Sequence, residues 1–287
     1  MVTVNLLGGL GNQMFQYAFG RYLSELLNQD LFLNTNIYQQ GKSNRKFDLD
    51  IFHLSECRIG DVEDSLYKDL ALGSNRVNIN ERFFHFDDLL IKMVKEHAAT
   101  RPANGDFNLV LSGYWQSFKY FQCIVDTLKS DFEFCNSPQI HWKALGEEIL
   151  RTNSVMVNVR RGDYLQKLDY HGVVNKEYIE KSIAFMKSKV EHPVFYIFSD
   201  DMQWCRGNIE IAADFVFVDE AYYDDKYQFY LQLMAQCKYF VISNSSFAWW
   251  SAWLSTFKDK IVIAPKQWFT NKELNTKDLL PVDWLTF

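Results

Sequence analysis

Two adjacent arginines, followed by a glycine and an aspartate, form the segment of this sequence that is best suited to chemistry: Arg160-Arg161-Gly162-Asp163. A guanidinium group offers a planar fork of hydrogen-bond donors and keeps its positive charge, so paired arginines suit a phosphate. The glycine allows the backbone to approach a ligand closely, and the aspartate can orient an arginine or accept from a sugar hydroxyl. A surface turn with a local Arg–Asp ion pair fits the same four residues, so other parts of the chain must decide.

Polar segments follow three predicted strands in this half of the chain. The arginine segment comes after the apolar, β-branched run 154–159, which predicts a buried strand. Ser199-Asp200-Asp201 follows a predicted strand at 194–198, and Asn244-Ser245-Ser246 follows one at 239–242.

The second half as a whole alternates strands with helices, which predicts a parallel, doubly wound sheet. Strands of such a sheet end at one edge, where ligands bind in open α/β proteins. We therefore expect the three polar segments to meet and to form a nucleotide or nucleotide-sugar site. The other elements predicted here are strands at 215–218 and 260–264 and helices at 176–190, 226–237 and 247–254.

Each polar segment also has a simpler interpretation. Ser245-Ser246 lies where a helix is predicted to begin, so its hydroxyls and amides suit a phosphate, but Ser246 also fits a plain helix N-cap. Asp200 and Asp201 fit a solvated helix start. Because three such coincidences at one sheet edge are less plausible than one ligand, the nucleotide-sugar interpretation is favoured.

The first half opens like a βαβ unit, with a strand at 2–7, a glycine-rich turn at 8–12 and an amphipathic helix at 13–27. The turn can direct amides at an anion, but it is neither G-x-G-x-x-G nor a P-loop, and its glycines also fit close packing of helix on strand. A strand at 109–117 ends in Tyr114-Trp115-Gln116, which fits a sugar site and core packing equally. The remaining predicted elements are strands at 31–34 and within 75–86, helices at 87–96, 118–129 and 139–151, and an exposed loop at 98–108.

Length and composition limit the classes of protein. The chain has 287 residues, enough for two domains, which we divide into 1–145 and 146–287. The net charge of −6 argues against nucleic acid as a partner. The five cysteines lack C-x-x-C spacing and the six histidines lack metal-ligand spacing, so we expect reduced thiols, no metal site and a cytoplasmic protein. Without a visible signal peptide or a long apolar run, any membrane association is expected to be peripheral, at the inner membrane.

Five ordered sequence blocks stand out once both halves are considered. They are Gly8–Ala18, Val159–Tyr164, His171–Val173, Phe198–Asp201 with Trp204-Cys205, and Ser243–Leu254. Together, over nearly the whole chain, they resemble glycosyltransferase family 11, the bacterial and animal α-1,2-fucosyltransferases. No single block is specific, whereas five in this order are.

The resemblance implies a GT-B-like α/β fold: two Rossmann-like domains with doubly wound parallel sheets and an interdomain cleft. It implies a galactoside 2-α-L-fucosyltransferase, which transfers L-fucose with inversion from GDP-β-L-fucose to a galactoside hydroxyl of a glycan. The partners would be the nucleotide-sugar donor and the glycan acceptor, with no cofactor and no metal. Domain 1–145, with its glycine-rich loop 8–13, would serve the acceptor side, and domain 146–287 would bind the nucleotide sugar.

Roles for individual residues follow from the same resemblance. Arg160 is expected to contact the β-phosphate and, with Asp163, to act in catalysis, while Arg161 contacts the donor or orients the loop. Acceptor contacts are expected from Tyr114, Trp115 and Gln116. The expected donor-binding residues are Asn158, Arg160, Arg161, Ser199, Asp200, Asp201, Asn244, Ser245, Ser246, Phe247, Gly9, Gly11, Asn12 and Gln13.

Two positions depart from the family pattern. Asn158 stands where relatives usually carry a histidine, and Tyr230 where they usually carry an aspartate that can read guanine. A tyrosine lacks the paired acceptors that the N–H groups of guanine need, so a guanine contact from Asp224 or Asp225, or a different nucleotide, stays open. The alternatives are therefore a transferase for another nucleotide-sugar donor, and a non-catalytic glycan- or nucleotide-binding protein with the same fold.

Overall fold

The computed structural model describes residues 1–287 except 40–42, 55–56, 61–75, 100–107, 139 and 167. The chain forms two compact units, of which the first comprises Met1–Cys135 with Asn275–Leu280 and the second Asn136–Leu274 with Pro281–Phe287. Each unit is built on its own parallel sheet, which confirms the α/β fold class. Residue 145, where the sequence-based division was placed, lies inside a helix of the second unit. The interdomain cleft stays a prediction.

The sheet of the first unit has the order β3-β2-β1-β5-β4, and its paired strands run parallel. The central strands are short apolar runs that are almost entirely buried, as the sequence predicts. Strand β3 was not predicted, because it lies at the edge and half-exposed side chains give it no apolar pattern. The strands are β1 (Val2–Asn5), β2 (Leu31–Asn34), β3 (Cys57–Gly60), β4 (Arg76–Asn80) and β5 (Asn108–Ser112).

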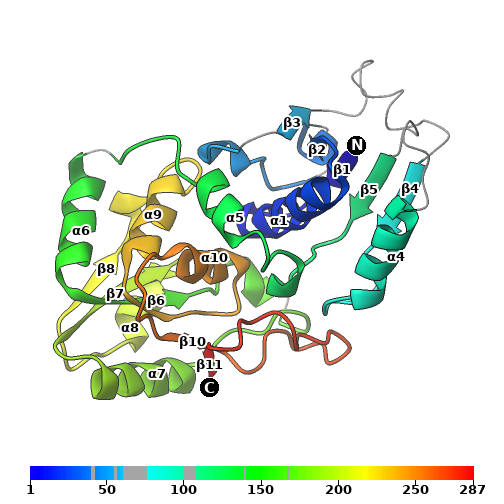
Figure 1. Ribbon diagram of the computed structural model, residues 1–287. Coiled ribbons are helices and arrows are strands. Elements are labelled where there is room, and N and C mark those ends of the chain that lie inside the picture. The colour runs from blue at the N-terminus through cyan, green and yellow to red at the C-terminus, as the bar shows by residue number, and fades with distance from the viewer. Residues whose placement is uncertain (40–42, 55–56, 61–75, 100–107, 139, 167) are drawn as a thin grey trace. The chain divides into compact units, whose positions relative to one another are not determined.

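Helix α1 (Leu10–Leu27) packs directly on this sheet beside β1 (Figure 1). Gly20 permits the close approach, because a Cβ at this position would overlap the side chain of Val4. The helix begins three residues earlier than the predicted start at 13, so Gly11 and Asn12 form part of its first turn. The glycine-rich turn is therefore shorter than the sequence suggests.

The other helices of the first unit are short. The segment 118–129, predicted as one helix, is divided between two elements, and the loop predicted at 98–108 falls almost wholly outside the described residues. The segment around Asp278 returns to this unit, where Lys119 Nζ lies 2.6 Å from its carboxylate. The elements are α2 (Asn36–Gln39), η1 (Leu49–Ile51), α4 (Asp88–Ala99), η2 (Phe118–Tyr120) and α5 (Val125–Asp131).

The sheet of the second unit has the order β11-β10-β9-β6-β7-β8, again with parallel pairing. The chain proceeds outward from β6 through β7 to β8, and then resumes on the other side of β6 with β9. This reversal is the switch point at which open α/β sheets bind ligands. The strands are β6 (Asn153–Val159), β7 (Pro193–Ser199), β8 (Phe215–Val218), β9 (Tyr239–Val241), β10 (Val262–Ala264) and β11 (Leu285–Thr286).

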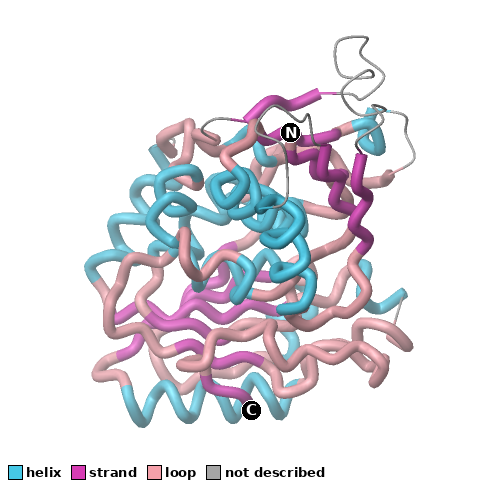
Figure 2. Tube along the Cα trace, turned by 45° about the vertical axis from the view of Figure 1, so that its right-hand side comes forward, coloured by secondary structure: helices cyan, strands magenta, loops and turns pink. Residues whose placement is uncertain are grey.

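Helices cover both faces of this second sheet, as expected for a doubly wound arrangement (Figures 1 and 2). Helices α7 and α8 lie against one face, and α6, α9 and α10 lie on the other. Helix α8 was not predicted as a separate element. The helices are α6 (Ile140–Arg151), α7 (Lys176–Lys189), α8 (Met202–Asn208), α9 (Gln228–Gln236) and α10 (Ser246–Leu254), with the short turns η3 (Asp163–Gln166) and η4 (Glu220–Tyr222).

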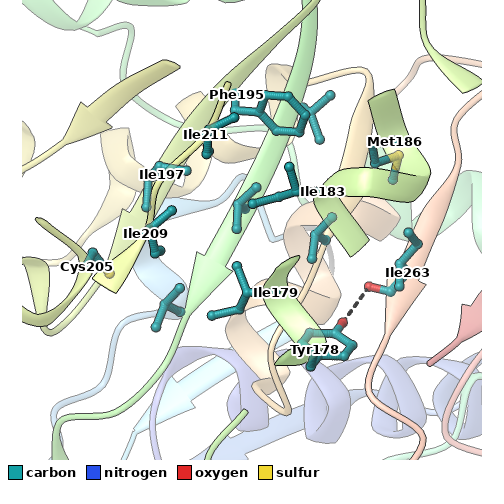
Figure 3. Close-up of a cluster of buried hydrophobic side chains, with 14 of the residues drawn as sticks. Tyr178, Ile179, Ile183, Met186, Phe195, Ile197, Cys205, Ile209, Ile211 and Ile263 are labelled. Carbon is teal, nitrogen blue, oxygen red and sulfur yellow. Dashed lines mark hydrogen bonds between the residues drawn. The ribbon is translucent and has the colours of Figure 1, made fainter. Parts of the chain in front are cut away.

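Strand β6 is buried on both faces because its alternate side chains enter two different cores. Val155 and Val157 join the cluster under α7 and α8, shown in Figure 3. In that cluster the hydroxyl of Tyr178 donates to the carbonyl of Ile263 at 3.1 Å and to that of Ile242 at 2.6 Å. These contacts fix the central strands, whose ends carry the polar segments.

Candidate active site

The three polar segments of the second half lie at the ends of three adjacent strands. In the register of the sheet, Val159 at the end of β6 lies opposite Ser199 at the end of β7, and Val157 lies opposite Val241 of β9. The prediction that the segments share one edge is therefore confirmed, and the central segment is the arginine segment at the switch point.

Arg160 lies between two carboxylates. Its Nη1 is 2.9 Å from Asp200 Oδ2, and its Nη2 is 2.5 Å from Asp163 Oδ1. The guanidinium also lies over the ring of Tyr164, with Cζ 5.3 Å from the ring centroid. The side chain remains 26% exposed, so this arginine is oriented by its neighbours and still accessible to a ligand.

Arg161 is held by its backbone as well as by its side chain. Its backbone N–H donates to Asp200 Oδ1 at 2.8 Å, and its Nε lies 3.2 Å from Asp201 Oδ2. The guanidinium packs on the ring of Trp204 at 4.1 Å. Arg161 therefore ties the end of β6 to the loop after β7, which favours the loop-orienting role over a direct phosphate contact.

The loop after β7 also begins helix α8. Asp201 is the N-cap, and its Oδ1 accepts from the backbone N–H of Trp204 at 3.1 Å. The simple helix-start interpretation of Asp201 is thus correct, in addition to its ion pair with Arg161. Gly162 faces this loop so closely that a Cβ would overlap the carboxylate of Asp200.

Asn158 holds neighbouring strand ends together, and Ser199 fixes the loop that follows its own strand. The hydroxyl of Ser243 donates to Asn158 Oδ1, and Asn158 Nδ2 donates to the carbonyl of Phe198 at 3.5 Å. The hydroxyl of Ser199 accepts from the N–H of Asp201 at 2.9 Å. Both side chains are buried, so the structure assigns them to the support of the site.

Tyr230 performs a similar task on the other side of β7. Its hydroxyl accepts from the N–H of Ser199 at 2.9 Å and lies 3.1 Å from the carbonyl of Val218, to which it donates. Burial holds the pKa of Tyr230 well above its usual range, so the hydroxyl stays protonated. The residue that departs from the family pattern therefore joins β7 to β8.

The N-terminus of α10 follows the end of β9. Ser245 is its N-cap, with Oγ accepting from the N–H of Ala248. Ser246 and Phe247 occupy the first turn, whose amides point toward the N-terminal end of the helix. Asn244 is buried just before the cap, and its Nδ2 donates to the carbonyls of His171 at 2.7 Å and Trp268 at 3.0 Å. This helix terminus suits an anion.

In the first unit, the glycine-rich turn and the end of β5 are linked. Gln116 Nε2 donates to Asn12 Oδ1 at 2.7 Å. Gln13 is fully buried, and its amide donates to the carbonyls of Gly8 at 3.0 Å and Lys46 at 2.8 Å. Gln13 therefore shapes the turn from inside instead of presenting its side chain to a ligand, whereas Gly9 and Gly11 lie at the start of α1.

Of the three residues expected to bind acceptor, only Tyr114 presents an exposed ring. Trp115 is 1% exposed and packs against Phe19, with 4.7 Å between ring centroids, so its ring belongs to the core. Gln116 is buried as well. Tyr114 is 37% exposed at the carboxyl end of β5. The core-packing interpretation thus holds for the tryptophan, while the tyrosine is partly exposed to solvent.

Glu81, which sequence reasoning missed, fixes this turn. It follows β4, and its carboxylate accepts from the N–H groups of Tyr114 at 2.7 Å and Trp115 at 2.9 Å. Burial raises the pKa of the Glu81 carboxyl, and these two hydrogen bonds oppose the rise. The range predicted to hold strands, 75–86, includes Glu81, so its place directly after a strand became visible only with the end of β4 at Asn80.

Three further features of the described residues concern the cysteines, possible metal ligands and possible membrane-spanning helices. All five cysteines are unbridged, and burial raises the pKa of the Cys205 thiol to about 11, which keeps this sulfur protonated. Among the residues that the structure describes, no cluster of three His, Cys, Asp or Glu side chains could hold a metal ion. No helix in the same described ranges is long and apolar enough to cross a membrane.

Comparison with solved structures places the fold. Fucosyltransferase NodZ from Bradyrhizobium matches with a TM-score of 0.52 and 11% identity, covering 88% of this chain and 92% of that chain. The two parallel sheets and this likeness show a GT-B-like α/β fold.

Sequence comparison then defines the family. Residues 69–286 match glycosyl transferase family 11. The chain is 32% identical to an α-1,2-colitosyltransferase of Escherichia coli, over 99% of this chain and 98% of the relative. It is 30% identical to the O-antigen biosynthesis glycosyltransferase WbnK of the same species, over 98% of each. The chain belongs to glycosyltransferase family 11 and is a glycosyltransferase.

Proposed function

We propose that this glycosyltransferase transfers L-fucose from GDP-β-L-fucose to the 2-hydroxyl of a galactoside, with inversion and without a metal ion. The observation that carries the proposal is that two phosphate-binding features follow adjacent strands. Arg160 follows β6, and the N-terminus of α10 follows β9. A guanidinium and helix amides on neighbouring strands at a switch point are suited to a diphosphate.

The proposed reaction breaks the bond between C1 of fucose and the β-phosphate oxygen, and forms a bond between C1 and the acceptor oxygen. The bonding electrons pass to the diphosphate, which gains negative charge as it leaves. Arg160 and the amides of Ser246 and Phe247 would stabilise that charge, because fixed donors in place need no reorganisation during the reaction. Arg161 would act indirectly, by holding the loop after β7.

Asp163 is proposed to receive the proton of the acceptor hydroxyl. In the structure its carboxylate is bound to Arg160, and its side chain is 46% exposed. A diphosphate that takes the guanidinium would replace this carboxylate and release it for proton transfer. Binding of the donor would thus prepare the base, and Asp200 would stay in place through the backbone N–H of Arg161.

Recognition of the base must differ from the usual family pattern, because Asn158 and Tyr230 are both engaged between strands. Asp224 is also committed: its two oxygens accept from the N–H groups of Gln228 and Phe229, at 2.9 Å each. Asp225 is exposed. It is therefore the proposed carboxylate for the N–H groups of guanine, and Asp225→Asn is expected to weaken binding of GDP more than that of UDP.

The acceptor is proposed to bind at the carboxyl edge of the first sheet. Tyr114 offers an exposed ring for stacking on a sugar, and Glu81 fixes the turn that presents it. The relatives include galactoside α-(1,2)-fucosyltransferases, one of them from Lagothrix lagotricha at 30% identity over 53% of this chain. Their names support a galactoside acceptor.

A second donor is favoured by one observation, the match over nearly the full length to an α-1,2-colitosyltransferase. Colitose is L-fucose without the 3-hydroxyl, so the same phosphate site would serve both. The deciding experiment offers the purified protein GDP-fucose, GDP-colitose and UDP- and dTDP-sugars with a panel of β-galactosides, with and without EDTA. The proposal expects an α-1,2-fucosylated product at equal rates in both buffers. Exclusive use of another donor, or binding of GDP without any product, would refute it.

A further inference from the structure

A stack of planar side chains stands beside the candidate phosphate-binding arginine. Tyr164 lies on η3, and Arg160 Cζ is 5.3 Å from the centroid of its ring. The ring of Tyr164 is stacked on that of His171, with 4.2 Å between centroids and 7° between planes. Tyr170 and Phe269 pack around His171 at 4.8 and 5.9 Å. Tyr164 is thus stacked on His171, which Tyr170 and Phe269 hold in turn.

The same tyrosine reaches the segment that precedes α10. Its hydroxyl donates to the backbone carbonyl of Asn244 at 3.1 Å. Asn244 in turn donates from Nδ2 to the carbonyl of His171 at 2.7 Å, so the stack and the segment are joined twice. Ser245, the N-cap of α10, is the next residue along the chain. Tyr164 therefore contacts both parts of the proposed diphosphate site.

This arrangement matters because the other contacts of Arg160 are not permanent under the proposed function. Its two ion pairs are made with carboxylates, and a diphosphate competes for the same N–H groups. The contact with the face of Tyr164 uses the guanidinium plane and leaves its N–H edge open to a ligand. A displacement of about 1 Å in such a site can cost on the order of 10²-fold in rate.

We propose that Tyr164 is a positioning residue that holds Arg160 and the N-terminus of α10 at the separation required by one diphosphate. The proposal rests on the proposed function for its substrate. The ring keeps the guanidinium in place while Asp163 is exchanged for phosphate, and the hydroxyl fixes the backbone from which the α10 amides start.

Two variants separate the ring from the hydroxyl. Tyr164→Phe keeps the stack and the guanidinium contact but loses the bond to Asn244, and is expected to lower kcat by about 2- to 10-fold. Tyr164→Leu loses both, and is expected to lower kcat by about 10- to 100-fold. KM for the acceptor should stay within about 2-fold of wild type in both. Tyr196→Phe is the matched control, because it removes a hydroxyl bonded to Glu148 elsewhere in the second unit.

A double-mutant cycle distinguishes positioning from general support of the fold. If the ring of Tyr164 acts through Arg160, then Tyr164→Leu costs no more than Tyr164→Phe once Arg160→Lys is present, because the fork that the ring positions is gone and only the bond to Asn244 is left to lose. Fully additive losses, or a lower melting temperature with unchanged kcat, would overturn the proposal. Affinities for GDP and for guanosine give a second measurement, in which only the affinity for GDP should fall.

Inorganic pyrophosphate keeps this test independent of the nucleotide. The cycle is repeated by calorimetry with pyrophosphate as the ligand. If the coupling between Tyr164 and Arg160 is retained with pyrophosphate but GDP-fucose gives no transfer, the proposed donor is refuted and the positioning role stands. Normal transfer from GDP-fucose with no coupling in either ligand would refute the positioning role alone.

Discussion

Replacement of Arg160 by lysine is the most direct test of the candidate site, because it keeps the charge and removes the fork. The structure shows two nitrogens of this guanidinium directed at separate partners, Asp200 at 2.9 Å and Asp163 at 2.5 Å. A diphosphate would take the direction of Asp163, while the direction toward Asp200 keeps the guanidinium oriented. An ammonium group at the end of a flexible stem serves one of them at a time.

The expected magnitude follows from the loss of one charge-assisted hydrogen bond. Such a bond contributes about 1.5–3 kcal/mol, which corresponds to roughly 10- to 150-fold in rate if it is made fully only in the transition state. We therefore expect Arg160→Lys to lower kcat by about 10²-fold, with a smaller change in the affinity for GDP. Release of GDP at saturating acceptor measures the first quantity and calorimetry the second.

Arg206→Lys provides a matched control within the same unit. Arg206 also pairs with a carboxylate, Asp219 at 2.5 Å, and lies over a ring, Phe217 at 4.8 Å, but its side chain is 52% exposed on α8. This exchange should leave kcat within about 2-fold of wild type, because exposed ion pairs contribute little. A near-normal kcat for Arg160→Lys, or equal losses in both variants, would refute the assignment of Arg160 to the phosphate.

Three further outcomes are expected. Gly162→Ala places a methyl group against the carboxylate of Asp200, which two hydrogen bonds hold in place. Turnover should therefore fall about 10-fold, while the melting temperature changes little. An unchanged rate would show that the loop can move without consequence. Tyr230→Phe leaves the buried N–H of Ser199 without its partner and should lower the free energy of unfolding by about 1–3 kcal/mol in urea titrations, and a stability equal to wild type would contradict the bridging role. Dialysis against EDTA should leave the initial rate unchanged, and recovery of a lost rate by a divalent ion would overturn the metal-independent mechanism.

The second unit was largely predictable because its strands are continuous apolar runs and its helices have clear stripes. The register of β6 between β7 and β9 brings the arginine segment, the aspartate pair and the serine segment to adjacent strand ends, as parallel pairing requires. The strands that were not predicted have weak sequence patterns. Strand β3 is a half-exposed edge strand of the first unit's sheet, and β11 is an edge strand of the second unit's sheet with only two residues. Such edges depend on tertiary contacts and not on pattern.

Residue types could not predict which polar and aromatic side chains of the site bond or pack within the protein and do not face a ligand. Asn158 and Ser199 are polar residues at strand ends, and Gln13 lies in the first turn of α1, yet each is buried in hydrogen bonds that shape the backbone. Trp115 follows the same rule, since its aromatic ring enters the core. A polar or aromatic residue beside a site serves either the ligand or the scaffold, and only three-dimensional partners decide which.

The carboxylate partners of Arg160 and Arg161 determine which of the two arginines can meet a phosphate. Two arginines meet three aspartates at this edge, so the described side chains of the segment carry no excess of positive charge for an anion. Charge alone would therefore predict weak phosphate binding. The two arginines differ in whether a ligand can displace their partners. Arg161 is fixed by a backbone N–H bond, an ion pair and Trp204, whereas one carboxylate partner of Arg160 belongs to the exposed Asp163. Because the N-terminus of α10 adds amide donors and its first turn holds no acidic residue, a diphosphate can exchange for Asp163 and gain contacts that this carboxylate lacks. Arginine density thus indicates the location of the site, but the exchangeable partner identifies which arginine meets the donor.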